Sequence, residues 1–249
     1  MTPAAAGRGS PRRKSRSLPR AVFTDIDGTL TDRERRMDLG AVRALTKLRE
    51  QRVPVIFATG NVLPVVLGLQ RFLGLEWPII AENGGMVYFS EDRVVRLARR
   101  EVAVKAYEQA RRRLDVRPLF TDRWRETEVA LEPTVPVEDV ERAVRGCGVR
   151  VESTGFAIHL FEPTAGKLPA AQMVARELGL SLSECLVAGD GDNDVALLRE
   201  AGIAVSFPDA SPSARASADY ITRARHGAGF LEALTRFGLL PAGWGRERP

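Results

Sequence analysis

The stretch AVFTDIDGTL, residues 21–30, ends an apolar run with two carboxylates and a glycine. Residues 21–24 are typical of a short buried strand, and Asp25 and Asp27 follow it directly. A spacing of two places both side chains on the same side of extended backbone, and Gly28 lets the chain turn sharply beyond them. The stretch therefore predicts a strand whose carboxyl end presents two acids.

The same pattern of apolar run, polar turn and helical segment occurs twice more. VPVIFATGNVLPVV spans residues 53–66, and CLVAGDGDNDVALLREAG spans residues 185–202. Helical periodicity over residues 39–50 and after Lys167 predicts helices between these segments. Residues 202–207 and 218–222 predict two further strands. This alternation predicts an α/β fold with a Rossmann-like parallel sheet.

The middle of the chain has a different order of elements. Residues 84–165 predict two strands, a helix, a short strand, a second helix and a final strand pair, which is typical of an inserted α+β cap domain. The expected organisation is a discontinuous core of residues 21–83 and 166–240 with a cap of residues 84–165. ENGG, residues 82–85, predicts either the hinge into the cap or a plain tight turn.

The basic charge of the chain is concentrated at its N-terminus. The net charge is +5, but residues 1–20 hold six of the 37 basic residues and none of the 32 acidic ones. The rest of the chain is therefore slightly acidic, which argues against a nucleic-acid partner. We expect residues 1–20 to be a disordered basic tail, either a solvated extension or the result of a misassigned start codon, with contact to RNA or a membrane surface as the alternative.

Hydropathy argues against a membrane protein. No apolar run approaches the roughly 18 residues needed to span a bilayer, and the N-terminus lacks the apolar core of a secretory signal. We expect a cytoplasmic protein without a membrane partner.

Four separate segments are predicted to meet in one crevice, because ligands collect at the carboxyl ends of parallel strands. They contribute Asp25 and Asp27, Thr59 and Asn61, Lys167, and Asp190 and Asp194. Four carboxylates would repel one another without a cation, and Mg²⁺ prefers carboxylate oxygens while keeping positions for phosphate and water. We therefore predict a magnesium site that involves Asp25, Asp27, Asp190 and Asp194.

These residue types suit phosphoryl transfer. One carboxylate can attack phosphorus while the second handles protons, and Lys167 can neutralise phosphoryl oxygens. Thr59 and Asn61 could bind phosphate, cap the following helix, or do both. Asn193 could orient Asp190 or a water molecule, or only cap its helix.

DIDGT, Thr59 at the end of VIFAT, Lys167 and GDGDND resemble the four motifs of haloacid dehalogenase superfamily phosphatases. The resemblance implies that Asp25 is the nucleophile and a metal ligand, and that Asp27 is the acid/base and gives its backbone carbonyl to the metal. It implies phosphate-binding roles for Thr59 and Lys167 and metal ligation by Asp190 and Asp194. The insert between Thr59 and Lys167 resembles the branch with a large α+β cap.

Further segments resemble the archaeal-type phosphoglycolate phosphatases. They are DIDGTLTDR, TGNVLPVV, RFLG, ENGG, TDRWRE and STGFAIHL, spread over residues 21 to 237. This resemblance implies Mg²⁺-dependent hydrolysis of 2-phosphoglycolate through an aspartyl-phosphate intermediate. A phosphatase for another small metabolite, such as a sugar phosphate or a phosphorylated glycerate, is the alternative, and a non-enzymatic binding protein is the opposing class. A homodimer is left open.

The cap offers candidate cations for a substrate carboxylate. Arg123 and Arg125 lie two apart in TDRWRE, and His159 lies in a predicted strand. We hypothesise that one of the three meets the carboxylate, against the alternative of a solvated hairpin. His226 is assigned no role.

Overall fold

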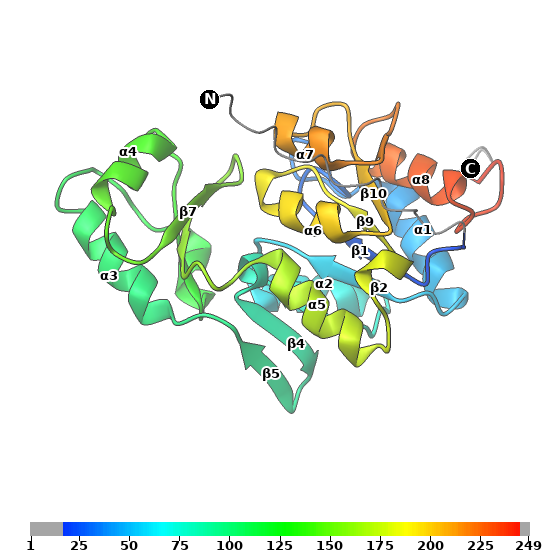
Figure 1. The fold of residues 1–249 in the computed structure, drawn as a ribbon, viewed down its shortest axis with the longest axis horizontal. Helices are drawn as coiled ribbons and strands as arrows, with labels where there is room; N and C mark the ends of the chain where they lie inside the picture. The colour runs from blue at the N-terminus through cyan, green and yellow to red at the C-terminus, as the bar shows by residue number, and fades with distance from the viewer. Residues whose placement is uncertain (1–16, 245–249) are drawn as a thin grey trace, which may run out of the picture.

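The computed structural model describes residues 17–244, which form two β-sheets with helices packed around them (Figure 1). Eight strands form the larger sheet and three strands form the smaller one. In Figure 1 the smaller sheet, with helices α3 and α4, lies to the left of the larger sheet. The expected α/β class with a parallel-sheet core is confirmed.

The larger sheet is parallel over its first six strands. In order across the sheet, the strands are β11 (Tyr220–Ile221), β10 (Ile203–Ser206), β9 (Cys185–Ala188), β1 (Ala21–Thr24), β2 (Val55–Ala58), β3 (Ile79–Ala81), β4 (Met86–Ser90) and β5 (Arg93–Arg96). Strand β1 is central, and its Phe23 lies opposite Ile56 of β2 and Val187 of β9. Every residue of β1, β2 and β9 is buried, which explains their uninterrupted apolar sequences.

Six helices pack on this sheet. They are α1 (Leu39–Glu50), α2 (Leu63–Phe72), α5 (Lys167–Glu177), α6 (Val195–Glu200), α7 (Pro212–Ser217) and α8 (His226–Arg236). Helix α1 contacts α8, and α5 contacts α6; Figure 1 shows α5 and α6 on the near side of the sheet. Asp38 is the N-cap of helix α1, and its carboxylate accepts a hydrogen bond from Ala41 N at 2.8 Å. Helix α5 is followed by Gly179, which has a φ of 66°. Helices α1, α2, α5 and α6 lie where the sequence predicts helices, whereas α7 and α8 were not predicted.

The smaller sheet has one apolar face and one polar face. Its order is β6 (Glu128–Leu131), β8 (Ile158–Phe161) and β7 (Arg150–Ser153), all antiparallel, with α3 (Arg100–Ala110) and α4 (Val137–Ala143). Val129 and Leu160 belong to the apolar core that this sheet shares with the two helices. Because side chains alternate along a strand, Glu128 and His159 lie on the opposite face.

Two strands expected in the cap belong to the larger sheet instead. Strand β4 pairs antiparallel with β3, and β5 pairs with β4. The hairpin of β4 and β5 thereby pairs the backbone N–H and C=O groups at the open edge of β3. Sequence periodicity predicts a strand but does not show which sheet the strand joins. The range 84–165 therefore includes strands of the larger sheet, and the chain passes to the smaller sheet only after β5. ENGG forms the turn between β3 and β4, which agrees with the prediction of a tight turn. It does not agree with the prediction of a hinge into the cap, because the chain leaves the larger sheet only after β5.

Residues 1–16 of the expected basic tail lie outside the described residues. Arg20, the last residue of the range, is held at the sheet, because its backbone N–H donates to Glu184 O at 2.9 Å and its side chain pairs with the Glu184 carboxylate at 2.8 Å. Between residues 17 and 244, no helix has the length and apolar character needed to cross a membrane.

Candidate active site

The predicted site residues follow the ends of neighbouring parallel strands. Asp25 follows β1, Thr59 follows β2 and Asp190 follows β9, while Lys167 is the first residue of α5. Because β2, β1 and β9 are adjacent and parallel, their carboxyl ends meet at one edge of the sheet. The structure thus brings together residues separated by up to 169 positions of sequence, from Asp25 to Asp194.

Lys167 forms the buried centre of the site. Its Nζ lies 3.0 Å from Asp25 Oδ1 and 2.7 Å from Asp194 Oδ1, and the Lys167 residue is only 2% exposed. Burial alone would lower the pKa of Lys167, but the two carboxylates reverse this effect and raise the pKa above its ordinary value. The ammonium group therefore stays charged.

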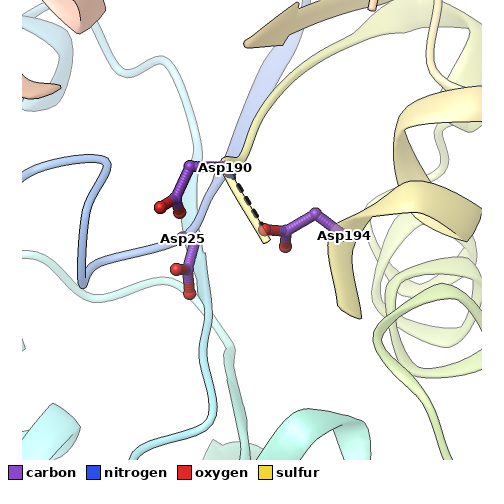
Figure 2. A group of neighbouring side chains, drawn as sticks. All are labelled: Asp25, Asp190 and Asp194. Atoms are coloured by element: carbon purple, nitrogen blue, oxygen red, sulfur yellow. Dashed lines mark hydrogen bonds between the residues drawn. The ribbon is translucent and has the colours of Figure 1, made fainter. Parts of the chain in front are cut away.

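Three carboxylates form an oxygen-rich cluster (Figure 2). One oxygen from each of Asp25, Asp190 and Asp194 lies within 4.8 Å of the others. The backbone N–H groups of Asp190 and Gly191 donate to Asp194 Oδ2 at 3.1 and 3.0 Å, which fixes its orientation. The loop between β9 and α6 therefore holds two of the three acids in place.

The acids of this cluster carry more negative charge than one lysine neutralises. Burial raises the pKa of Asp25 well above its usual range against the opposing Lys167 charge, and Asp194, Asp190 and Asp27 add to the rise. Burial and the Asp194 charge raise the pKa of Asp190 to about 7. A divalent cation would remove this repulsion, and an all-oxygen donor set suits a hard ion such as Mg²⁺.

Asp27 lies apart from this cluster. Its Oδ2 accepts a hydrogen bond from Asn61 Nδ2, and its Oδ1 accepts one from Arg35 Nε at 3.1 Å. The side chain of Asp27 is thus positioned by two donors, separately from the carboxylates of Asp25 and Asp194 that contact Lys167.

Thr59 and Asn61 form one unit beside Asp27. Thr59 Oγ1 accepts hydrogen bonds from the backbone N–H of Asn61 at 3.1 Å and from its Nδ2 at 3.2 Å. Neither residue caps α2, whose N-cap is Val62 without a side-chain hydrogen bond. The helix-capping alternative is therefore not what the structure shows.

A cavity of about 320 Å³ lies above these groups, between the two sheets. Its lining comprises Asp25, Asp27, Ser153, Thr154, Gly155, Phe156, Asp190, Gly191, Asp192, Asn193, Asp209 and Ser211. Residues 153–156 connect β7 to β8, so the smaller sheet supplies one wall and the larger sheet the other. A small phosphorylated molecule fits a cavity of this size.

Asp209 and His226 are residues of the site that the sequence interpretation missed. Asp209 follows β10 closely, so the rule that identified Asp25 and Asp190 could have found it. His226 Nδ1 lies 2.7 Å from Gly28 O, and its Nε2 lies 3.0 Å from Asp209 Oδ2. No sequence signal indicates the contact between His226 and Gly28, which lie 198 positions apart.

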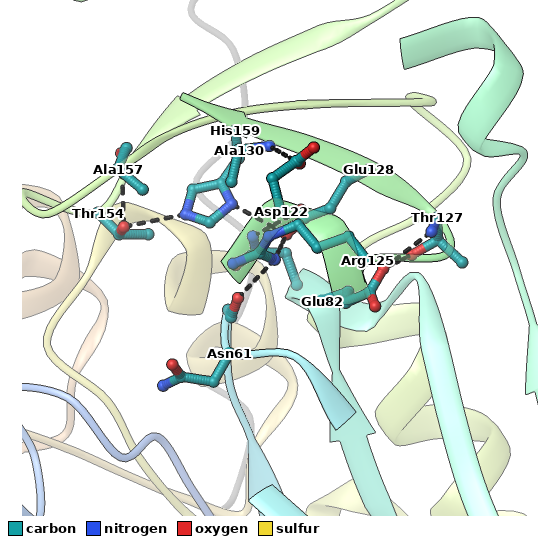
Figure 3. A network of polar contacts seen from close by, with 12 residues as sticks. Asn61, Glu82, Asp122, Arg125, Thr127, Glu128, Ala130, Thr154, Ala157 and His159 are labelled. Carbon is teal, nitrogen blue, oxygen red and sulfur yellow. Dashed lines mark hydrogen bonds and ion pairs between the residues drawn. The ribbon is translucent and has the colours of Figure 1, made fainter. Parts of the chain in front are cut away.

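None of the three candidates for a substrate carboxylate, Arg123, Arg125 and His159, lines the cavity. Arg125 and His159 are buried, and both contact Glu128 Oε1 (Figure 3). Arg123 lies instead over the Phe120 ring, 4.1 Å from its centroid. The positions of these side chains therefore give no support to the carboxylate-binding hypothesis.

Glu128 joins the smaller sheet to the loop after β2 and to the turn after β3. Arg125 Nη1 also donates to Gly60 O at 2.9 Å, next to Thr59, and Asn83 Nδ2 donates to Glu128 Oε2 at 3.0 Å. Burial would raise the pKa of Glu128, but the nearby His159 and Arg125 outweigh it and lower the pKa to about 2. Glu128 is therefore an ionised carboxylate within a buried network.

Two further contacts extend this network to the cavity. His159 Nε2 lies 3.1 Å from Thr154 Oγ1, in the cavity wall, and Asn193 Nδ2 donates to Asn83 Oδ1 at 3.0 Å. Asn193 thus orients the loop that carries Asp190 and Asp194 through Asn83.

The comparisons with known proteins agree with this geometry. The chain matches the family model of haloacid dehalogenase-like hydrolases over residues 22–114 and 135–234. It is 38% identical over 218 residues to the phosphoglycolate phosphatase of Methanothermobacter thermautotrophicus, covering 88% of this chain and 98% of that protein. The phosphoglycolate phosphatase of Methanopyrus kandleri is 37% identical over 221 residues, covering 86% and 95%. A crystal structure from Thermoplasma acidophilum has a TM-score of 0.83 at 26% identity and covers 90% of this chain and 100% of that one.

The parallel sheet, the buried lysine and the acids at the strand ends define a phosphatase. The chain belongs to the haloacid dehalogenase-like hydrolase family. The resemblance stated from its motifs is confirmed.

Proposed function

We propose that the protein hydrolyses 2-phosphoglycolate to glycolate and phosphate with Mg²⁺ as cofactor. The observation that carries this proposal is the contact of Lys167 with both Asp25 and Asp194, next to a cavity that residues 153–156 help to line. The substrate is taken from the two phosphoglycolate phosphatases to which the chain is similar.

Asp25 is the proposed nucleophile. One of its carboxylate oxygens forms a bond to phosphorus while the bond from phosphorus to the glycolate oxygen breaks, and Asp27 transfers a proton to that oxygen. Glycolate leaves, and Asp25 carries the phosphoryl group as an acyl phosphate. Asn61 and Arg35 hold the Asp27 carboxyl during this transfer.

The second half of the reaction restores Asp25. Asp27 accepts a proton from a water molecule, whose oxygen bonds to phosphorus as the bond to Asp25 breaks. Lys167 and Thr59 would bind the phosphoryl oxygens, and Asn61 would keep Thr59 in position. Asp25, Asp190, Asp194 and the backbone carbonyl of Asp27 would hold Mg²⁺, which when bound neutralises charge on the transferring group.

A phosphatase for another small ester is the second candidate. Ser153, Thr154 and Ser211 line the cavity with hydroxyl groups, which would suit a sugar phosphate or a phosphorylated glycerate.

Phosphate release from a panel of such esters tests the proposal. The wild type and Asp25→Asn are compared in Mg²⁺ and in chelator. We expect 2-phosphoglycolate to have the highest kcat/KM, and Asp25→Asn to lose activity by roughly four orders of magnitude. A higher kcat/KM for a sugar phosphate would reject 2-phosphoglycolate as the preferred substrate but leave the proposed mechanism unchanged. Full activity of Asp25→Asn would overturn the mechanism.

A further inference from the structure

The cavity wall has an unbalanced charge for an anionic substrate. The lining includes five aspartates and, among residues 17–244, neither a lysine nor an arginine. Lys167 lies beneath the wall and is already shared by Asp25 and Asp194. A phosphate ester that also carries a carboxylate therefore needs a further cation at the edge of the cavity.

Arg35 occupies such a position. Its Nε donates to Asp27 Oδ1 at 3.1 Å, and its guanidinium carbon lies 4.8 Å from the centroid of the Phe156 ring. Asp27 and Phe156 both line the cavity, one from each sheet. Arg35 thus bridges the two walls next to the residue proposed to protonate the leaving oxygen.

The guanidinium of Arg35 has donors to spare. Among the described residues it hydrogen bonds only through Nε, so the N–H groups of Nη1 and Nη2 remain for a ligand. The guanidinium carbon of Arg35 lies over the Phe156 ring, and the edge of a guanidinium is the part that binds a carboxylate through two parallel hydrogen bonds.

The backbone at this position is unusual for a long side chain. Arg35 has a φ of 63°, in the left-handed region that favours glycine or asparagine, within a turn closed by Asp32 N donating to Arg36 O at 3.0 Å.

We propose that Arg35 binds the carboxylate group of the substrate and so sets the preference for phosphorylated acids over phosphate esters that lack a carboxylate. This inference rests on the proposed function. In 2-phosphoglycolate one methylene group separates the carboxylate from the bridging oxygen, so the cation that binds it must lie beside the acid that protonates that oxygen. Arg35, in contact with Asp27, meets this requirement.

The test compares 2-phosphoglycolate with ethyl phosphate, which lacks the carboxylate. Arg35→Gly is the main variant, because glycine adopts a φ of 63° without strain and the fold should be kept. We expect the ratio of kcat/KM for 2-phosphoglycolate to that for ethyl phosphate to fall on the order of 10- to 100-fold. Loss of the contact with Asp27 should lower kcat for both esters alike, whereas weaker binding should raise the Michaelis constant for 2-phosphoglycolate alone, so the ratio isolates the binding effect.

Two neighbouring arginines provide the controls. Arg36 lies in the same turn but pairs with Asp32 and Glu34, and Arg33 lies 3.8 Å from Asp209. Arg36→Ala and Arg33→Ala should keep the wild-type ratio. An unchanged ratio in Arg35→Gly, or a fall of the same size in Arg33→Ala, would overturn the proposal.

A binding measurement separates this proposal from the proposed function. Calorimetry compares 3-phosphonopropionate, which carries a carboxylate, with propylphosphonate, which does not. We expect wild type to bind the former more tightly and Arg35→Gly to lose that preference. If the preference depends on Arg35 but 2-phosphoglycolate is not hydrolysed, the proposed function fails and the anion site stands; a preference that is absent, or that survives in Arg35→Gly, rejects the site.

Discussion

Asn83 Nδ2 donates a hydrogen bond to Glu128 Oε2 at 3.0 Å and thereby joins the turn after β3 to strand β6 of the smaller sheet. The same Asn83 accepts a hydrogen bond from Asn193, which lies between Asp190 and Asp194. Because Arg125 also connects Glu128 to Gly60, one carboxylate is linked to the loops after β2 and β9. The position of the smaller sheet is therefore coupled to the geometry of the site beneath it.

Replacement of Glu128 should destabilise the protein strongly. In Glu128→Gln the buried Arg125 and His159 lose their ionised partner, and breaking a buried ion pair in this way costs about 3–5 kcal/mol of unfolding free energy. Urea unfolding measures the change. Glu138→Gln is the control, because Glu138 is exposed on α4 and its replacement should change stability by less than about 0.5 kcal/mol. Equal stability of the two variants would contradict the assigned role of Glu128.

Glu82 should make stability depend on pH. Glu82 is buried and accepts hydrogen bonds from Thr127 N at 2.8 Å and Thr127 Oγ1 at 2.6 Å. Burial and the nearby Glu128 charge nevertheless raise the pKa of Glu82 from 4.5 to about 7. The folded state therefore binds the proton more tightly than the unfolded state does, so this contribution is complete below pH 4.5 and is lost as the pH rises through 7.

The measurement compares wild type with Glu82→Gln, which resembles the protonated side chain at every pH. Urea unfolding at pH 5, 6.5 and 8, with Mg²⁺ present, should show the stability of wild type falling relative to Glu82→Gln by up to about 3 kcal/mol. A difference that does not vary with pH would show that Glu82 has an ordinary pKa.

Sequence patterns predicted the acids of the site because each follows a parallel strand. Asp25 and Asp190 lie close together because each follows the carboxyl end of a parallel strand, and in such folds the carboxyl ends of the strands form the binding site. The same patterns failed for Arg125 and His159, because a sequence shows charges but not their partners, and Glu128 neutralises both across the smaller sheet. The contact of His226 with the DIDGT turn depends on the packing of α8 and has no local signal.

Gly28 gives the sharpest test of the predicted cation site. Its φ is 76°, and a Cβ atom at this residue would lie 2.2 Å from Asp190 Oδ2. Gly28→Ala should therefore both strain the backbone and displace the Asp190 carboxylate. Gly179→Ala is the matched control, because Gly179 has a φ of 66° and no atom lies within 4 Å of its added Cβ.

Both variants should lose about 1 kcal/mol of stability from the left-handed backbone, but only Gly28→Ala should respond less to Mg²⁺. For wild type and Gly179→Ala, Mg²⁺ at about 100 times its dissociation constant should add about 2.7 kcal/mol to the unfolding free energy. Thermal unfolding with and without Mg²⁺ measures this response. A full Mg²⁺ response in Gly28→Ala would mean that Asp190 does not hold the cation, because the substitution moves that carboxylate while leaving Asp25 and Asp194 on Lys167.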